Sequence, residues 1–121
     1  MGKRILVIDD DLKSRKLVTD LLNISGYTII EATDGKQGVD LAKAERPDLI
    51  ITDIQMPIMD GIEATKLIKA DIYTRNIPII CVSSYAMKGD SERALEVGCD
   101  TYITKPLDIH ELMSVVKKYL Q

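Results

Sequence analysis

Short apolar runs rich in β-branched residues alternate along the chain with longer stretches in which apolar residues recur every three or four positions. The short runs have the length and composition of buried strands. They are RILVID (4–9), YTIIEA (27–32), DLIITD (48–53), IPIICVSS (77–84) and TYIT (101–104). The stretches between and after them have the period of a helix that buries one face. The pattern therefore predicts five strands that alternate with five helices.

Two of the predicted helices carry a clear apolar stripe. The stripe residues are Leu17, Val18, Leu21 and Leu22 in the first helix, and Ile109, Leu112, Met113, Val116 and Leu120 in the last. We expect each helix to pack this stripe against the sheet.

The alternation of strands and helices also predicts the fold class. Strands separated by helices pair in parallel through right-handed crossovers, which place helices on both faces of the sheet. We expect an α/β fold with an open, doubly wound, five-stranded parallel sheet and five helices. The 121 residues contain no linker, repeat or low-complexity stretch, so residues 1–121 are predicted to form one domain.

Composition narrows the function classes. The net charge of −3 and the sequence pI near 5.1 argue against direct binding to nucleic acid. The apolar runs are too short to cross a bilayer and the start has no secretory signal, so we predict a cytoplasmic protein without membrane insertion. Cys81 and Cys99 are interpreted as buried structural thiols.

Chemically active side chains gather where the predicted strands end. The first strand ends at Asp9 and Asp10, the third at Asp53, the fourth at Ser83 and Ser84, and the fifth just before Lys105. Ligands of doubly wound sheets bind at this carboxyl edge. Neighbouring carboxylates repel one another unless a positive group joins them, and a set of hard oxygen ligands suits Mg²⁺. Asp11, by contrast, is interpreted as the cap of the first helix.

The blocks VIDDD (7–11), DLIITDIQMPIMDGIE (48–63), PIICVSS (78–84) and TYITKPL (101–107) resemble the signature of the response-regulator receiver domain of two-component signalling. The resemblance covers the whole chain and implies the flavodoxin-like strand order 2-1-3-4-5. It also implies that Asp53 accepts a phosphoryl group. A carboxylate can form such an acyl phosphate when the charge of the incoming group is neutralised.

The same resemblance assigns the other site residues. Asp10, Asp53 and the backbone carbonyl of Gln55 are expected to bind Mg²⁺, and Asp9 to act on the metal mostly through water. Lys105 and the Ser83 hydroxyl are expected to contact the phosphoryl group.

The resemblance to receivers also implies which residues transmit the phosphorylation signal and which affect the lifetime of the acyl phosphate. Ser83 and Tyr102 are expected to form the switch, and the Lys105–Pro106 bond is typically cis in the family, although nothing local forces that isomer. Gln55 and Tyr85 are expected to flank the approach of water to the acyl phosphate. Tyr85 has two interpretations: its ring shields the phosphoryl group and slows self-dephosphorylation, or it points outward and affects only partner contacts.

Two other classes of protein, a phosphatase and a flavin protein, fit the sequence less well than a receiver. A phosphatase of the haloacid dehalogenase type needs an acidic residue two positions after its aspartyl nucleophile, where this chain has Gln55, and a cap insertion is missing. A flavin protein is disfavoured because carboxylates at the strand edge repel the cofactor phosphate. We therefore expect that the protein is not an enzyme. Its only expected reactions are Mg²⁺-dependent self-phosphorylation and slow self-dephosphorylation.

The expected partners are a sensor histidine kinase or histidine phosphotransfer protein, and a downstream protein bound at the face of the fourth helix, fifth strand and fifth helix. AMKGDSER (86–93) is similar to the loop of stand-alone receivers of the DivK type, so we expect a stand-alone protein. The alternative is a receiver module excised from a longer regulator or hybrid kinase. KSRK (13–16) is interpreted first as a solvated helix face and second as a kinase docking surface, and His110 as a surface residue.

Overall fold

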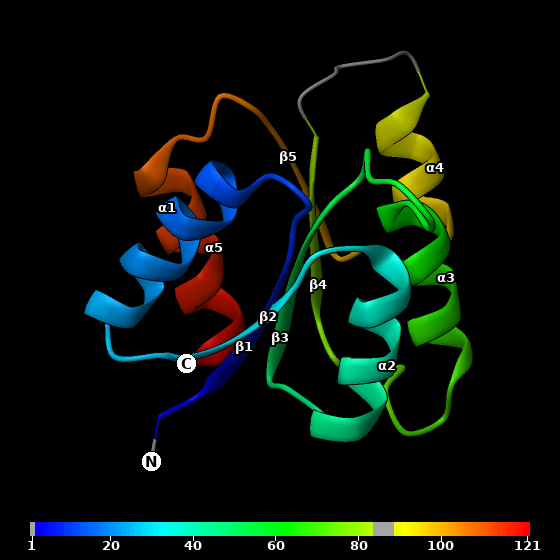
Figure 1. Cartoon of the computed structure of the whole chain (residues 1–121), viewed down its shortest axis with the longest axis horizontal. Helices are drawn as coiled ribbons and strands as arrows, with labels where there is room; N and C mark the ends of the chain where they lie inside the picture. Colours follow the sequence, from blue (N-terminus) through cyan, green and yellow to red (C-terminus); the bar gives the residue numbers. More distant parts are fainter. Residues whose placement is uncertain (1, 84–88) are drawn as a thin grey trace.

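Five parallel strands form one sheet in the order β2-β1-β3-β4-β5 (Figure 1). The structure is a computed structural model that describes residues 2–83 and 89–121. Its elements are β1 (Arg4–Ile8), α1 (Leu12–Ile24), β2 (Thr28–Ala32), α2 (Gly35–Glu45), β3 (Leu49–Asp53), α3 (Gly61–Ala70), β4 (Ile79–Ser83), α4 (Asp90–Glu96), β5 (Thr101–Thr104) and α5 (Ile109–Leu120). The predicted fold class and strand order are confirmed.

Helices cover both faces of the sheet. In Figure 1, α1 and α5 lie on one side, and α2, α3 and α4 lie on the other. Side chains alternate along β1 because successive residues of a strand point to opposite faces. Ile5 and Val7 pack in the core beneath α1 and α5, whereas Leu6 and Ile8 pack in the core beneath α2 and α3. The central strands are therefore buried on both faces, which explains their continuous apolar runs.

Aspartates begin several helices, as the sequence predicted for Asp11. The side chain of Asp11 accepts from Ser14 N (3.3 Å), and Asp60 accepts from Glu63 N (2.8 Å). Asp108 accepts from the backbone N–H groups of the first turn of α5. These caps satisfy donors that have no partner within the helix, and each is worth about 1 kcal/mol.

The predicted apolar stripes are wrong at two positions. Leu17 is 50% exposed and Ile109 is 44% exposed. The buried face of α1 is made instead by Val18, Thr19 and Leu22. Thr19 can be buried because its hydroxyl donates to the carbonyl of Lys16 (3.1 Å), which satisfies this buried polar group.

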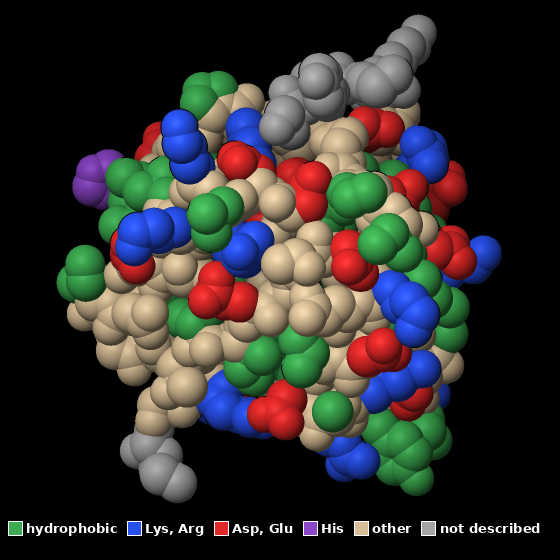
Figure 2. All heavy atoms as spheres, in the orientation of Figure 1, with side chains coloured by type: hydrophobic (Ala, Val, Ile, Leu, Met, Phe, Trp, Pro, Cys, Tyr) green, Lys and Arg blue, Asp and Glu red, His purple; other side chains and the backbone are tan. Residues whose placement is uncertain are grey.

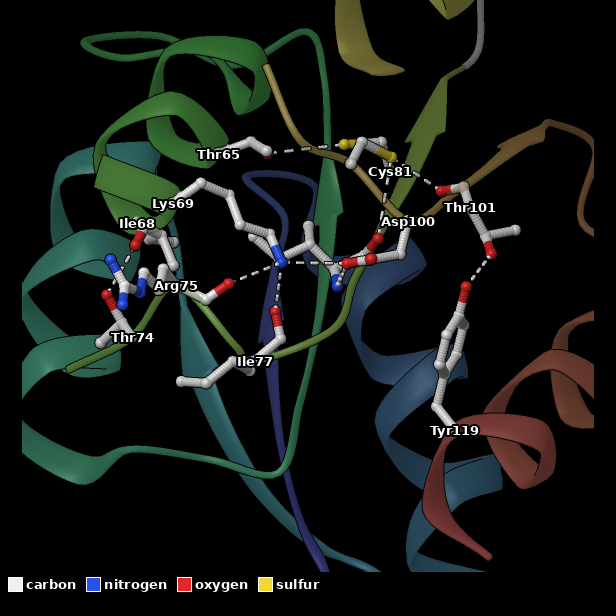
Figure 3. A network of polar contacts seen from close by, with 12 residues as sticks. Thr65, Ile68, Lys69, Thr74, Arg75, Ile77, Cys81, Asp100, Thr101 and Tyr119 are labelled. Atoms are coloured by element: carbon white, nitrogen blue, oxygen red, sulfur yellow. Dashed lines mark hydrogen bonds and ion pairs between the residues drawn. The ribbon is translucent and has the colours of Figure 1, made fainter. Parts of the chain in front are cut away.

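Lys69 on α3 contacts the segments that precede β4 and β5 (Figure 3). Its ammonium donates to the carbonyls of Arg75 (3.2 Å) and Ile77 (2.8 Å) and pairs with Asp100 (3.1 Å). The Asp100 carboxylate also accepts from Ile79 N (2.8 Å). This network anchors the connection between α3 and β4 at the edge opposite the strand carboxyl ends.

The two cysteines lie in the same region of the core. Cys81 and Cys99 are both free and buried, as the interpretation as structural thiols requires. A hydrogen bond to Cys99 and burial both raise the pKa of the Cys81 thiol, which keeps that thiol protonated.

The surface is mixed in charge. Acidic and basic side chains are interspersed over the face shown in Figure 2, and the histidine lies at its edge. His110 is exposed, as predicted. Across residues 2–83 and 89–121, each helix is too short or too polar to span a bilayer.

Candidate functional site

Three carboxylates meet at the carboxyl edge of the sheet. Asp9 and Asp10 directly follow β1, and Asp53 is the last residue of β3, the neighbouring strand. One oxygen from each lies within 4.8 Å of the others. Asp9 and Asp53 are buried, with 6% and 8% of their surface exposed, whereas Asp10 is exposed. The structure thus brings together the acidic residues that the sequence predicted to cluster.

Burial makes the charged form of two of these carboxylates costly. The pKa of Asp53 is raised to about 6, mainly by burial and to a smaller extent by the charge of Asp9, while the charge of Lys105 opposes the shift. Burial likewise raises the pKa of Asp9, against the effects of the Asp11 N–H and of Lys105. Since both shifts report an environment that disfavours negative charge, a cation at this position would relieve it.

Lys105 supplies part of the positive charge. Its ammonium lies 3.6 Å from Asp53 Oδ2 and 3.7 Å from Asp9 Oδ2. It also donates to Ser14 Oγ (3.1 Å). The Lys105–Pro106 bond is cis, which is the isomer that the resemblance implied.

The backbone around Asp53 is held closely. Ile54 N donates to Asp53 Oδ1 (3.0 Å), and Gly61 N donates to the carbonyl of Ile54 (2.8 Å). A Cβ at Gly61 would overlap the backbone carbonyl of Asp53, so only glycine allows α3 to begin so close to the end of β3. The start of α3 therefore helps to position Asp53.

The hydroxyl and the amide expected near the phosphoryl group contact each other. Ser83 is fully buried at the end of β4, and its hydroxyl donates to Gln55 Oε1 (3.0 Å). Gln55 Nε2 in turn donates to Asp90 Oδ2 (3.3 Å). Asp90, at the start of α4, is a residue that the sequence reasoning missed, because nothing along the chain indicates which side chains pair across 35 residues.

Arg15 is a second missed residue. Its guanidinium donates to the backbone carbonyl of Asp9 (2.7 Å) and pairs with Glu31 on β2 (2.9 Å), and its side chain is only 12% exposed. The interpretation of residues 13–16 as a solvated face is therefore wrong at Arg15. Its position one turn after the Asp11 cap was a usable signal, since helical side chains lean back toward the N-terminus and hence toward the strand end.

The remaining predicted residues are placed as follows. Tyr102 on β5 is half-buried and packs against the core beneath α2, α3 and α4. The predictions for Ser84 and Tyr85 concern residues outside the described ranges.

The fold and the clustered carboxylates are those of a phosphorylation-regulated signalling module. Residues 5–117 match the model of the response regulator receiver domain, and the chain belongs to this family. It is 42% identical over 120 residues to the polar-differentiation response regulator DivK of Brucella anthropi, a match that covers 99% of this chain and 98% of DivK. This match confirms the phosphoryl-accepting class predicted from the sequence. Receivers are signalling proteins rather than conventional enzymes.

Solved structures agree with this assignment. The receiver domain of a Pseudomonas aeruginosa sensor histidine kinase, which has a magnesium ion coordinated in its active-site cleft, is 32% identical and superimposes with a TM-score of 0.92, covering 99% of this chain and 98% of that one. A chain of the Borrelia burgdorferi CheX–CheY–BeF3–Mg complex is 29% identical, with a TM-score of 0.89 and coverage of 98% and 90%.

Proposed function

We propose that this receiver, formed by residues 1–121, accepts a phosphoryl group on Asp53 from a histidine kinase or histidine phosphotransfer protein. The observation that carries the proposal is the position of Asp53: it is a buried carboxylate at a strand end, with the Lys105 ammonium 3.6 Å away and two further carboxylates beside it. The resemblance to receivers supports Asp53, rather than Asp9 or Asp10, as the acceptor.

In the proposed reaction, a carboxylate oxygen of Asp53 attacks phosphorus and forms the new O–P bond. The bond between phosphorus and the donor atom breaks, and the donor leaves with that electron pair. The attacking form is the ionised one, which predominates at pH 7 because the pKa of Asp53 is about 6. Lys105 stabilises the negative charge on the transferred group, and the Ser83 hydroxyl donates to one of its oxygens.

The carboxylate cluster fits Mg²⁺. Its donors are all hard oxygens and two of the three carboxylates are buried. Burial, together with the charge of Asp9, raises the pKa of Asp53 despite the nearby Lys105, so a bound cation would stabilise its ionised form. Asp10, Asp53 and the backbone carbonyl of Gln55 would hold the ion, and Asp9 would act through water. When bound, Mg²⁺ neutralises charge on the phosphoryl oxygens.

Output is proposed to pass through Ser83 and Tyr102 to the face formed by α4, β5 and α5. Two exposed apolar side chains support a protein partner there: Leu95 on α4 is 52% exposed and Ile109 on α5 is 44% exposed. The CheY-containing neighbour was solved in complex with CheX, which shows a receiver of this fold bound to another protein.

Gln55 and Tyr85 are proposed to tune the slow self-dephosphorylation, and the protein is not expected to turn over other substrates. The stand-alone form and the cytoplasmic location stay predictions from the sequence.

The direct test is labelling with acetyl phosphate, followed by intact mass and peptide mapping. The parent protein should gain one phosphoryl group on Asp53 in the presence of Mg²⁺ and none with excess EDTA. Asp53→Asn should abolish labelling, whereas Asp40→Asn, which removes an exposed carboxylate from α2, should not. Equal labelling of the Asp53→Asn variant at Asp9 or Asp10 would refute the assignment of the acceptor.

A further inference from the structure

A chain of polar side chains leads from the buried Ser83 to the first turn of α4. Ser83 Oγ donates to Gln55 Oε1 (3.0 Å), and Gln55 Nε2 donates to Asp90 Oδ2 (3.3 Å). The guanidinium of Arg93, one turn further along α4, contacts Asp90 Oδ1 (3.3 Å). These contacts join the end of β4, the segment after β3 and helix α4, which are separate in the sequence.

The buried carboxylate of Asp90 obtains hydrogen-bond partners from this series of contacts. Its side chain is only 8% exposed, and a buried carboxylate is costly unless each oxygen is hydrogen-bonded or paired. Arg93 is 61% exposed, so its ion pair with Asp90 is screened by solvent and weak. The amide of Gln55 hydrogen-bonds the other oxygen of Asp90, so Asp90 helps to hold that amide in place.

The chemistry of the four groups sets the direction of every hydrogen bond. An ionised carboxylate only accepts hydrogen bonds, so Asp90 requires the amide nitrogen of Gln55 to face it. The amide oxygen then faces Ser83, and the hydroxyl proton of Ser83 must point toward Gln55. Asp90 thus determines where the Ser83 proton points, although the two residues do not touch.

There is room for this arrangement to change. Gln55, Asp90 and Arg93 line a hollow together with Met56 and Ile62. An amide side chain at the wall of an open hollow can take another rotamer without displacing packed core atoms.

We propose that Asp90 is a positioning residue that acts through Gln55 on the Ser83 hydroxyl, and that this relay couples the phosphoryl site to α4. The inference rests on the proposed function, because a phosphoryl group on Asp53 is what draws the Ser83 proton away from Gln55. Gln55 then loses its donor, its bond to Asp90 weakens and α4 is released from the resting contact. This route reaches α4 without involving Tyr102.

An exchange of amide and carboxylate tests the relay. Gln55→Glu places two carboxylates against each other and should break the contact with position 90. Combining it with Asp90→Asn restores a donor and an acceptor in the reversed order, and Ser83 can still donate to the side chain at position 55. Asp40→Asn, in an exposed ion pair on α2, is the control for loss of one negative charge.

The readout is hydrogen–deuterium exchange of residues 90–96 in the full chain, with and without Mg²⁺ and beryllofluoride, a mimic of the phosphoryl group. In the parent and in Asp40→Asn, the mimic should change exchange in α4. Asp90→Ala should lose about half or more of that change. The single Gln55→Glu variant should also lose it, and the Gln55→Glu/Asp90→Asn double variant should regain it.

Two results would overturn the relay: a full α4 response in Asp90→Ala, or a double variant that responds no better than Gln55→Glu alone. The double variant keeps the test valid if Asp90→Ala fails to fold. Labelling of Asp53 by acetyl phosphate, measured by mass in the same preparations, reports the proposed function separately. Asp90→Ala should still be labelled, so a parent that is labelled while its variants show an unaltered α4 response would refute only the relay.

Discussion

The ammonium of Lys105, which follows β5, lies 3.6 Å from Asp53 Oδ2 at the end of β3, although β4 lies between these two strands in the sheet. The two residues are 52 positions apart in the sequence, yet each lies at the same edge of one parallel sheet. The ion pair matters because Asp53 and Asp9 are otherwise acidic neighbours in a buried environment. The charge of Lys105 is therefore expected to govern both the ionisation of Asp53 and its reactivity.

Replacing Lys105 by Met should raise the pKa of Asp53 above about 6, because Lys105 is the group whose charge most lowers it. Less Asp53 would then be ionised at neutral pH, and labelling by acetyl phosphate should slow at least tenfold. The pKa can be followed from the side-chain carbon signal of Asp53 by NMR. Lys118→Met on α5 is the control, and an unchanged pKa in Lys105→Met would contradict the role given to Lys105.

Without metal, the protein should become more stable as the pH falls from about 7 toward 4. The folded-state pKa of Asp53 is raised to about 6, so between that value and the unfolded value near 3.8 the folded protein binds more protons than the unfolded chain. The free energy of unfolding therefore decreases as pH rises through this window. Asp9 acts in the same direction because its pKa is also raised.

Asp53→Asn should reduce this dependence and stabilise the metal-free protein at pH 7 by about 1–2 kcal/mol. Urea denaturation at pH 5 and pH 7, with EDTA present, measures both effects. The prediction would be wrong if the parent were less stable at pH 5 than at pH 7 and the variant showed the same pH dependence. Ionisation of Asp53 would then not lower the free energy of unfolding.

Mg²⁺ should stabilise the parent, by about 1.4 kcal/mol at ten times its dissociation constant. Asp10→Asn keeps the shape of the side chain and removes a charge that raises the pKa of Asp9, so it should increase the melting temperature of the metal-free protein. The same substitution should reduce the gain on adding Mg²⁺. Thermal melts in EDTA and in excess Mg²⁺ test both statements, and a lower metal-free melting temperature in Asp10→Asn would argue against mutual repulsion.

Arg15→Ala should destabilise the protein by about 1–2 kcal/mol, because it leaves the backbone carbonyl of Asp9 without its guanidinium donor and Glu31 without its ion pair. Lys16→Ala is the matched control, since Lys16 is 71% exposed and pairs with Asp20 on the same helix. If both variants lose the same small amount in urea denaturation, Arg15 is a surface residue after all.

Most of the candidate site could be predicted because a parallel sheet collects strand ends. Once the apolar runs are read as parallel strands, Asp9, Asp53 and Lys105 must lie at one edge, and the acidic cluster follows. The burial of the central strands on both faces also follows from their continuous apolar runs.

What could not be predicted depends on side-chain placement rather than on period. The helical period defines the buried face of α1 only to within about one residue's rotation. It therefore does not decide whether Leu17 or Thr19, which flank Val18 on opposite sides, completes that face. Thr19 is buried because a local hydrogen bond satisfies its hydroxyl. Gln55 and Asp90 meet only because α4 packs beside the segment after β3, and no local pattern encodes that contact.

Gly61→Ala should disturb the acceptor directly, since a Cβ at this position would overlap the backbone carbonyl of Asp53. Either α3 or the end of β3 must shift, at a cost of about 1–3 kcal/mol in the free energy of unfolding. Because the carboxylate of Asp53 moves with its backbone, labelling by acetyl phosphate should also slow.

Gly26→Ala is the control that separates a loss of stability from a displacement of the Asp53 carboxylate. Gly26 has a φ of 95° after α1, with open space where a Cβ would lie, so alanine there costs backbone strain far from the site. Both variants should be less stable in urea denaturation, but only Gly61→Ala should label slowly at a temperature where each is folded. Normal labelling of Gly61→Ala would mean that the start of α3 supports the fold without positioning Asp53.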